Sequence, residues 1–146
     1  MQRILVAVDW SPASDAVLAH AGDLARATGA ALLVLHVADP EPELVGYDPG
    51  PQSVRDAVAG ELREERRRLE EAARHLRERG IAEVEPVLRR GPTADTILET
   101  AERFAADVVV VGSRGHGAVL GMLLGSVSRA LLRASKRPVV VVPAGT

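Results

Sequence analysis

The feature that most restricts the fold of this chain is the alternation of short aliphatic runs with longer helical patterns. Several runs are almost continuously apolar, which is typical of strands buried on both faces of a parallel sheet. The predicted strands are Ile4–Val8, Ala31–Val37, Glu83–Leu88, Val108–Val111 and Val139–Val142. The predicted helices are Pro12–Thr28, Gln52–Arg79, Thr93–Phe104 and Ser126–Arg133. Right-handed crossovers then predict an α/β fold, an open parallel sheet with helices on both faces.

Local signals set the expected ends and faces of these helices. Ser11 precedes Pro12 in a pattern typical of an N-cap followed by proline at the first helical position, and Gly29 stands where a C-terminal glycine is favoured. The helix over Gln52–Arg79 carries apolar residues at helical spacing, and the charge run "ELREERRRLEEAARHLRER" forms its opposite face. We expect that face to be solvated and to contain ion pairs between residues four apart, rather than to act as an interaction tail.

The composition limits the core and the possible partners. With 146 residues the chain is long enough to bury one core, and we expect residues 1–146 to form a single domain. Hydrophobic residues make up 47% of the chain and aromatic residues only 2%, so the core must be aliphatic. A net charge of −2 and the scarcity of aromatic side chains favour neither nucleic acid nor an anionic membrane surface as a partner.

Cysteine usage and the N-terminal residues indicate the compartment. The chain has no cysteine, which excludes disulfides and thiolate zinc sites and suits a reducing cytosol. The apolar run Ile4–Val8 meets Asp9 too early for a signal peptide or a membrane helix. We therefore expect a cytoplasmic protein.

Ligands of open α/β sheets bind outside the carboxyl ends of the strands, where the strand order reverses. Candidate residues therefore follow the strands directly: Asp9 after the first, Val37 to Asp39 at the end of the second, and Gly112 to Gly115 after the fourth. The stretch Asp39–Pro51 is rich in proline and glycine, and we expect it to be a mobile loop over this ligand edge.

The glycine-rich segment after the fourth strand has the chemistry of a phosphate site. Glycines allow a positive φ and leave no Cβ between backbone and ligand, so that several N–H groups can converge on anionic oxygens. Gly125-Ser126 then opens a helix whose first N–H groups favour a phosphate. The candidate glycines are Gly112, Gly115 and Gly117, the hydroxyl donors are Ser126 and Ser128, and the cations are Arg114, His116 and Arg129.

The alternative to that interpretation is purely structural. A glycine-rich turn between a strand and a helix is common in α/β folds and needs no ligand. The spacing also fits neither the G-x-x-x-x-G-K-[ST] loop nor the G-x-G-x-x-G fingerprint, since "VDWSPAS" follows the first strand. A P-loop NTPase and a dinucleotide-dependent dehydrogenase are therefore disfavoured.

The spacing Gly112-x2-Gly115-x9-Gly125-Ser126 resembles the ATP-binding signature G-x2-G-x9-G-[ST] of the universal stress protein family. The segments "ILVAVDWSPAS", "LLVLHV" and "RPVVVVP" resemble the family's first, second and last strands in the same order, so the resemblance covers essentially the whole chain. It implies a flavodoxin-like, Rossmann-like sandwich with a five-stranded parallel sheet in the order 3-2-1-4-5. That order places the turns at Asp9 and Gly112 opposite each other.

The resemblance also implies which residues bind ATP, which we expect together with Mg²⁺. Those near the adenine and ribose are Ala7, Val8, Asp9 and Val37. Those around the ribose and phosphates are Gly112, Ser113, Arg114, Gly115, His116 and Gly117, and those at the helix start are Gly125, Ser126, Val127 and Ser128. As alternatives, Asp9 is a plain turn residue and His116 faces solvent. Trp10 departs from the small residue common in the family, and it either flanks the nucleotide or covers apolar surface.

The residues outside this segment indicate neither a metal site nor a catalytic group. His20, His36 and His75 have no metal-ligand spacing. Phosphoryl transfer needs a residue that orients the nucleophile and a dedicated cation, and the sequence offers no convincing base near the glycines. We expect an ATP-binding stress-response regulator; the alternatives are a slow ATPase or nucleotide-transferring enzyme on the same fold, and a flavin module, which the scarcity of aromatics disfavours.

The last strand predicts an assembly. Val139–Val142 lies between Pro138 and Pro143 and would form a long apolar sheet edge, which is a liability unless it is paired or covered. The resemblance implies that this strand pairs antiparallel with its copy across a two-fold axis. We therefore expect a homodimer; the alternative is an edge masked by the C-terminal tail.

Overall fold

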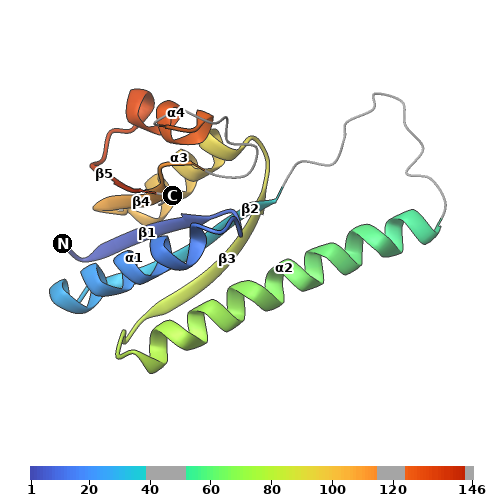
Figure 1. Ribbon diagram of the computed structural model, residues 1–146, viewed down its shortest axis with the longest axis horizontal. Helices are drawn as coiled ribbons and strands as arrows, with labels where there is room; N and C mark the ends of the chain where they lie inside the picture. The colour runs from blue at the N-terminus through green and yellow to red at the C-terminus, as the bar shows by residue number, and fades with distance from the viewer. Residues whose placement is uncertain (39–51, 115–123, 144–146) are drawn as a thin grey trace.

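The computed structural model describes residues 1–38, 52–114 and 124–143, without the side chains of 52–58. The loop predicted over Asp39–Pro51 lies outside the described residues. The strands are β1 (Arg3–Val8), β2 (Ala31–Ala38), β3 (Val84–Arg90), β4 (Val108–Gly112) and β5 (Val139–Val142), and the helices are α1 (Ser14–Thr28), α2 (Gln52–Glu78), α3 (Thr93–Phe104) and α4 (Ser126–Ala134). Every predicted element is present, with ends that differ by at most a few residues (Figure 1).

The strands form one parallel sheet in the order β3-β2-β1-β4-β5, which confirms the predicted topology. The register places Val6 of β1 between Val34 of β2 and Val110 of β4. The chain therefore runs from β1 to β3 toward one edge and crosses back to place β4 beside β1. The strand order reverses between β1 and β4, and the loops after these two strands begin at the same edge of the sheet.

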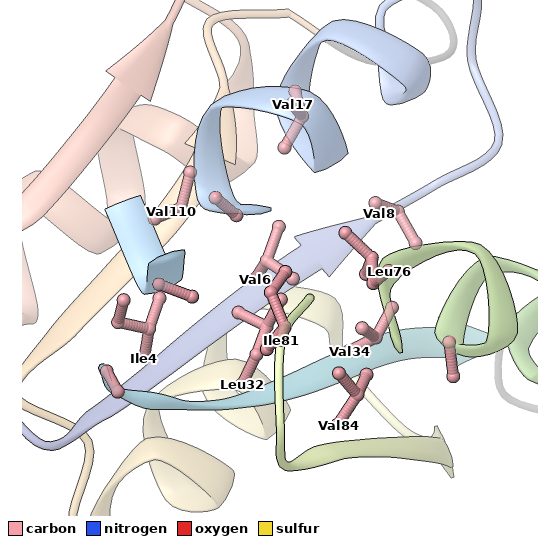
Figure 2. Close-up of a cluster of buried hydrophobic side chains, with 14 of the residues drawn as sticks. Ile4, Val6, Val8, Val17, Leu32, Val34, Leu76, Ile81, Val84 and Val110 are labelled. Carbon is pink, nitrogen blue, oxygen red and sulfur yellow. The ribbon is translucent and has the colours of Figure 1, made fainter. Parts of the chain in front are cut away.

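Side chains that alternate along the strands point into two aliphatic cores, one on each face of the sheet. Ile4, Val6 and Val8 of β1 point to the face covered by α1 and α2, where Val17 and Leu76 join them (Figure 2). Leu5 points to the opposite face, which α3 and α4 cover. Burial of β1 on both faces explains why its sequence reads as a continuous apolar run.

The start of α1 corrects one prediction. The helix begins at Ser14, not at Pro12, and its N-cap is Ala13 without a side-chain cap hydrogen bond. Ser11 and Pro12 belong to a turn in which the Ser14 N–H donates to the Ser11 carbonyl at 2.9 Å. The cap was misplaced because the Ser14 N–H, which a Ser11 cap would satisfy with its hydroxyl, is bonded to the Ser11 carbonyl instead. The C-terminal Gly29, with φ of 73°, ends the helix as predicted.

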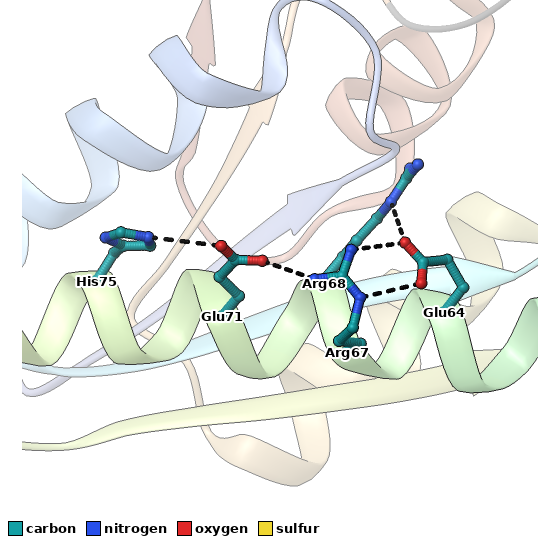
Figure 3. A network of polar contacts seen from close by, with 5 residues as sticks. All are labelled: Glu64, Arg67, Arg68, Glu71 and His75. Atoms are coloured by element: carbon teal, nitrogen blue, oxygen red, sulfur yellow. Dashed lines mark hydrogen bonds and ion pairs between the residues drawn. The ribbon is translucent and has the colours of Figure 1, made fainter.

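The exposed face of α2 confirms the expected ion pairs. Arg67 contacts Glu64 at 2.7 Å and Glu71 at 3.0 Å, and the contacts continue to His75 along the helix (Figure 3). Hydrogen bonds from Arg67 hold the pKa of the Glu64 carboxyl below its ordinary value. Exposed pairs of this kind contribute little to stability. Within the described part of the chain, no helix is both long and apolar enough to cross a membrane.

Candidate functional site

A cleft of about 510 Å³ lies at the carboxyl ends of β1, β2 and β4. This volume is within the range of small-molecule sites, and the position is the point where the strand order reverses. Its walls come from every helix and from the turn after β1. The lining residues are Ala7, Val8, Asp9, Trp10, Ser11, Ala13, Ser14, Val17, His36, Val37, Glu65, Arg68, Thr93, Ile97, Val111, Gly112, Arg114, Leu124, Gly125, Ser126, Val127, Ser128 and Arg129.

The turn after β1 is organised by Asp9. Its Oδ1 accepts the backbone N–H of Ser11 at 2.9 Å and the hydroxyl of Ser14 at 3.3 Å. These bonds give Asp9 the turn role that was one of its two predicted interpretations. They also fix the carboxylate at the rim of the cleft, where its ligand role stays a prediction.

Trp10 follows Asp9 with φ of 60°, a left-handed conformation that bulky residues rarely adopt. The indole lines the cleft and also packs against the core cluster under α1 and α2. Its Nε1 is buried and has no hydrogen-bond partner among the residues that the structure describes. Trp10 therefore covers apolar surface at the wall of the cleft, and its role beside a nucleotide stays a prediction.

Gly112 ends β4 and shows why glycine stands there. Its φ is not positive, so this glycine does not use the left-handed conformation that its residue type allows. A Cβ on Gly112 would lie 3.3 Å from the Arg114 carbonyl and 3.3 Å from a Val17 methyl carbon. The position needs glycine for close packing, which lets the chain turn tightly from β4 past α1.

The start of α4 is tied back to the end of β4. The Gly125 N–H donates to the Ser113 carbonyl at 2.6 Å, and the Ser128 hydroxyl donates to the Gly112 carbonyl at 2.6 Å. Among the described residues no side chain caps α4, and the first N–H groups of a helix have no acceptor within the helix itself. Ser126 is exposed and lines the cleft at this end. Backbone N–H groups and a hydroxyl thus meet at the positive end of a helix dipole.

The structure brings together most of the predicted site residues that it describes. Those in the lining are Ala7, Val8, Asp9, Val37, Gly112, Arg114, Gly125, Ser126, Val127 and Ser128. Ser113 is buried and is not among the lining residues; its N–H donates to the Val142 carbonyl at 2.8 Å, which links β4 to β5. The predicted ligands Gly115, His116 and Gly117 lie outside the described residues.

Residues that the sequence did not single out also line the cleft. Glu65 and Arg68 come from α2, and Thr93 and Ile97 come from the first turns of α3. Arg68 contacts Glu64 at 3.6 Å, and the end of its side chain points away from the helix (Figure 3). A usable signal existed, because a helix that follows a parallel strand begins at the carboxyl edge of the sheet. It does not say which faces of these helices turn toward the cleft.

His36 is the other residue that the sequence interpretation missed. It lies on β2, is 6% exposed and lines the cleft beneath Trp10. Its Nδ1 is 2.8 Å from the Val8 carbonyl, and its Nε2 is 3.3 Å from Glu65 Oε1. Two elements far apart in sequence thus meet at one imidazole.

The electrostatics of the lining suit an anion. The lining contains three arginines, Arg68, Arg114 and Arg129, and two carboxylates, Asp9 and Glu65. Both carboxylates already accept hydrogen bonds or ion pairs from other residues of the chain. Among the described residues no group of three or more His, Asp or Glu side chains is placed to hold a metal ion.

Known proteins with similar sequences and folds belong to one family. A model described as the universal stress protein family matches residues 1–143. The chain is 33% identical over 145 residues to "Universal stress protein in QAH/OAS sulfhydrylase 3'region" of Thermus aquaticus, covering 97% of this chain and 98% of that protein. The universal stress protein UspA from Lactobacillus plantarum has the same fold, with a TM-score of 0.85 at 21% identity, and the alignment covers 97% of each chain.

One solved structure adds a ligand. It is a universal stress protein in complex with cAMP, with a TM-score of 0.68 and 28% identity, and the alignment covers 99% of this chain and 98% of that chain.

Proposed function

The chain belongs to the universal stress protein family, and on that premise we propose that it is an ATP-binding regulatory protein of the stress response. We propose a single domain over residues 1–146, with ATP bound as its magnesium complex in the cleft at the carboxyl ends of the strands. The cAMP complex of a related protein supports an adenine nucleotide as the ligand class.

One observation carries the proposal. Asp9 lies more than a hundred residues before Gly112 in the sequence, yet Asp9, Gly112 and the residues from Gly125 to Ser128 line one cleft. The glycine and serine end offers backbone N–H groups and hydroxyls at the start of α4, which is the chemistry that phosphate oxygens require. The other end is lined by Ala7, Val37 and Ile97, which suit the apolar faces of a base.

We assign the predicted residues to two subsites on that basis. The base and ribose subsite comprises Ala7, Val8, Asp9 and Val37. The phosphate subsite comprises Gly112, Ser113, Arg114, Gly115, His116 and Gly117, followed by Gly125, Ser126, Val127 and Ser128. Magnesium would enter with the phosphates.

Binding, rather than turnover, is the activity that this site supports. The two carboxylates of the described lining are engaged elsewhere: Asp9 in its own turn and Glu65 with His36. Neither is set up to orient a water molecule for attack on a phosphate, which phosphoryl transfer requires. We therefore propose that nucleotide occupancy, and not product formation, is the signal.

The test uses Trp10, the only tryptophan of the chain, as its reporter. Purified protein is extracted with acid to identify any nucleotide it carries, and ATP is titrated against Trp10 emission. We expect saturable binding. If no nucleotide is released and ATP up to millimolar concentration leaves the emission unchanged, the proposed function is wrong.

A matched pair of variants tests the location of the site. Gly125→Val places a branched side chain at the start of α4 and should abolish ATP binding. Gly60→Val, in α2 outside the cleft lining, should leave it intact. Equal affinity in the parent and the Gly125→Val variant would remove the phosphate subsite from its assigned place.

We further propose a homodimer formed through β5. This strand is the last in the sheet order and pairs with β4 on one side. Val140, in the middle of β5, is 39% exposed although it lies in an aliphatic strand. Antiparallel pairing with a second copy would continue the sheet and remove the free edge. Sedimentation at micromolar concentration tests this, and a monomer would contradict it.

A further inference from the structure

His36 occupies an unusual position for a histidine in a parallel sheet. It is the only ring in β2, its residue is 6% exposed, and it contacts the last residue of β1 and the middle of α2 together. The Val8 carbonyl that it contacts directly precedes Asp9, the residue that organises the turn at the cleft. The imidazole therefore links α2 to the end of β1 that carries the proposed base and ribose subsite.

The two partners of His36 restrict its protonation state. The Val8 carbonyl at 2.8 Å from Nδ1 is an acceptor only, and the Glu65 carboxylate at 3.3 Å from Nε2 is also an acceptor when ionised. Neutral imidazole has one N–H, so it can satisfy only one of these oxygens and turns a lone pair toward the other. The imidazolium has two N–H groups and satisfies both.

We propose that His36 is a positioning residue. When protonated, it links the end of β1 to α2 by contacting both the Val8 carbonyl and Glu65, and we call this link the clip. The clip makes nucleotide affinity depend on pH. Loss of the proton leaves one contact unmade and frees the Glu65 side chain, while α2 itself stays packed on the sheet through Leu69, Ala73 and Leu76. Histidine is the side chain that proteins most often use to change charge between pH 5 and 8.

The charged surroundings of His36 come from every element packed against it. From α2 come Glu65 and Arg68, and Arg68 also contacts Glu64 at 3.6 Å. The turn after β1 adds Asp9, which lines the same cleft. On β3 the register partner of His36 is the uncharged Leu88, and Arg90 pairs with Ala38 two residues further along. The residues of α1 in the cleft lining, Ser14 and Val17, are uncharged.

The direction of the pH effect follows from the charge of the clip. The His36–Glu65 pair is neutral when the imidazole is protonated and carries one negative charge when it is not. An anionic nucleotide in the same cleft is repelled by that charge. We expect affinity for ATP to be about three- to tenfold higher with the clip protonated, as for one charge change several ångströms away in a partly screened cleft. This consequence rests on the proposed ATP binding, whereas the clip itself does not.

The first experiment measures protonation of the clip in the absence of nucleotide. Trp10, the only tryptophan, lies with its ring centroid 5.6 Å from that of His36, and an imidazolium quenches indole emission more strongly than neutral imidazole does. We expect Trp10 emission to fall through one proton-binding transition as the pH is lowered from 8 to 5.5. The transition should disappear in His36→Gln and move to lower pH in Glu65→Gln.

Two features keep this test decisive. The Glu65 side chain is 29% exposed, so Glu65→Gln should fold even if His36→Gln does not, and circular dichroism checks both. His75→Gln is the matched control, because His75 lies on the solvated face of α2 with its side chain 61% exposed, and it should leave the transition unchanged. A flat emission profile, or a transition that is identical in the parent and in Glu65→Gln, would overturn the proposal.

The second experiment measures ATP affinity at pH 6 and pH 8. Because the terminal phosphate of ATP itself titrates in this range, the quantity compared is the ratio of affinities between the parent and His36→Gln, which lacks the titrating imidazole, at each pH. That ratio should change about three- to tenfold between the two values, and a constant ratio would contradict the pH-dependent affinity. If ATP does not bind at all, the proposed function fails, while the nucleotide-free titration still decides the clip.

Discussion

The hydroxyl of Ser128 donates a hydrogen bond of 2.6 Å to the backbone carbonyl of Gly112. This bond joins the first turn of α4 to the last residue of β4, the two ends of the segment that carries the family signature. The same hydroxyl lies 3.2 Å from the Ser113 carbonyl, so one buried side chain satisfies the backbone at the end of the strand. The glycine-rich segment is therefore held at both ends by the fold itself.

Ser128→Ala should destabilise the protein. The side chain is 3% exposed, and its removal leaves the Gly112 carbonyl without this donor, which costs about 1 to 3 kcal/mol. Urea denaturation followed by circular dichroism measures the change in the free energy of unfolding. A variant as stable as the parent would show that the bond is replaced, for example by water.

Ser126→Ala should weaken ATP binding without changing the stability of the protein. Ser126 is exposed at the start of α4, so its loss should leave the unfolding free energy within experimental error. ATP affinity should fall roughly tenfold or more, because a hydrogen bond to a charged phosphate is lost. Titration against Trp10 emission compares the variant with the parent. An unchanged affinity would place the phosphates away from this hydroxyl.

Gly112→Ala should destabilise the protein because its Cβ would meet the Arg114 carbonyl and the Val17 side chain at 3.3 Å. Overpacking of this kind costs about 1 to 3 kcal/mol. The matched control is Gly60→Ala in α2, where the nearest atom is 4.0 Å away and alanine is favoured by about 0.5 to 1 kcal/mol. Thermal unfolding should therefore move in opposite directions in the two variants.

Asp107→Asn should lower stability at neutral pH and have no effect in acid. Asp107 Oδ2 accepts the N–H groups of Gln2 at 2.6 Å and Arg3 at 2.9 Å, and these bonds hold the pKa of the carboxyl below its ordinary value. A carboxyl with a lowered pKa in the folded state contributes stability above its unfolded pKa and loses it as the pH falls through the folded value. The urea midpoints of parent and variant should differ at pH 7 and converge below pH 3. A difference that persists in acid would mean that the bonds do not depend on the charge.

Val140→Glu should convert the proposed homodimer into a monomer. The exposed position on β5 would bring two carboxylates together across the antiparallel pair, and like charges opposite each other are destabilising. Sedimentation velocity measures the assembly. Glu85→Lys, a charge change at an exposed site on β3 at the other sheet edge, should leave it unchanged. A parent that is already monomeric would remove the prediction altogether.

The fold was predictable because its signals are local and strong. Aliphatic runs such as Val108–Val111 have no polar face, so they can only be strands buried on both sides, and the helices between them require a parallel sheet. The order of the strands came from the resemblance and not from these patterns. The start of α1 was misjudged because the Ser14 N–H donates to the Ser11 carbonyl, so that Ser11 and Pro12 form a turn before the helix begins.

The sequence by itself determined the class of fold, the aliphatic character of the core and the edge of the sheet where the cleft lies, because periodicity and glycine spacing are local patterns. Only the tertiary structure decided that Glu65 and Arg68 of α2 line the cleft, that Gly112 is needed for packing and that His36 lies between Val8 and Glu65. Each of these depends on which side chains from distant elements meet. Those contacts follow from the packing of helices on the sheet, which no local pattern records.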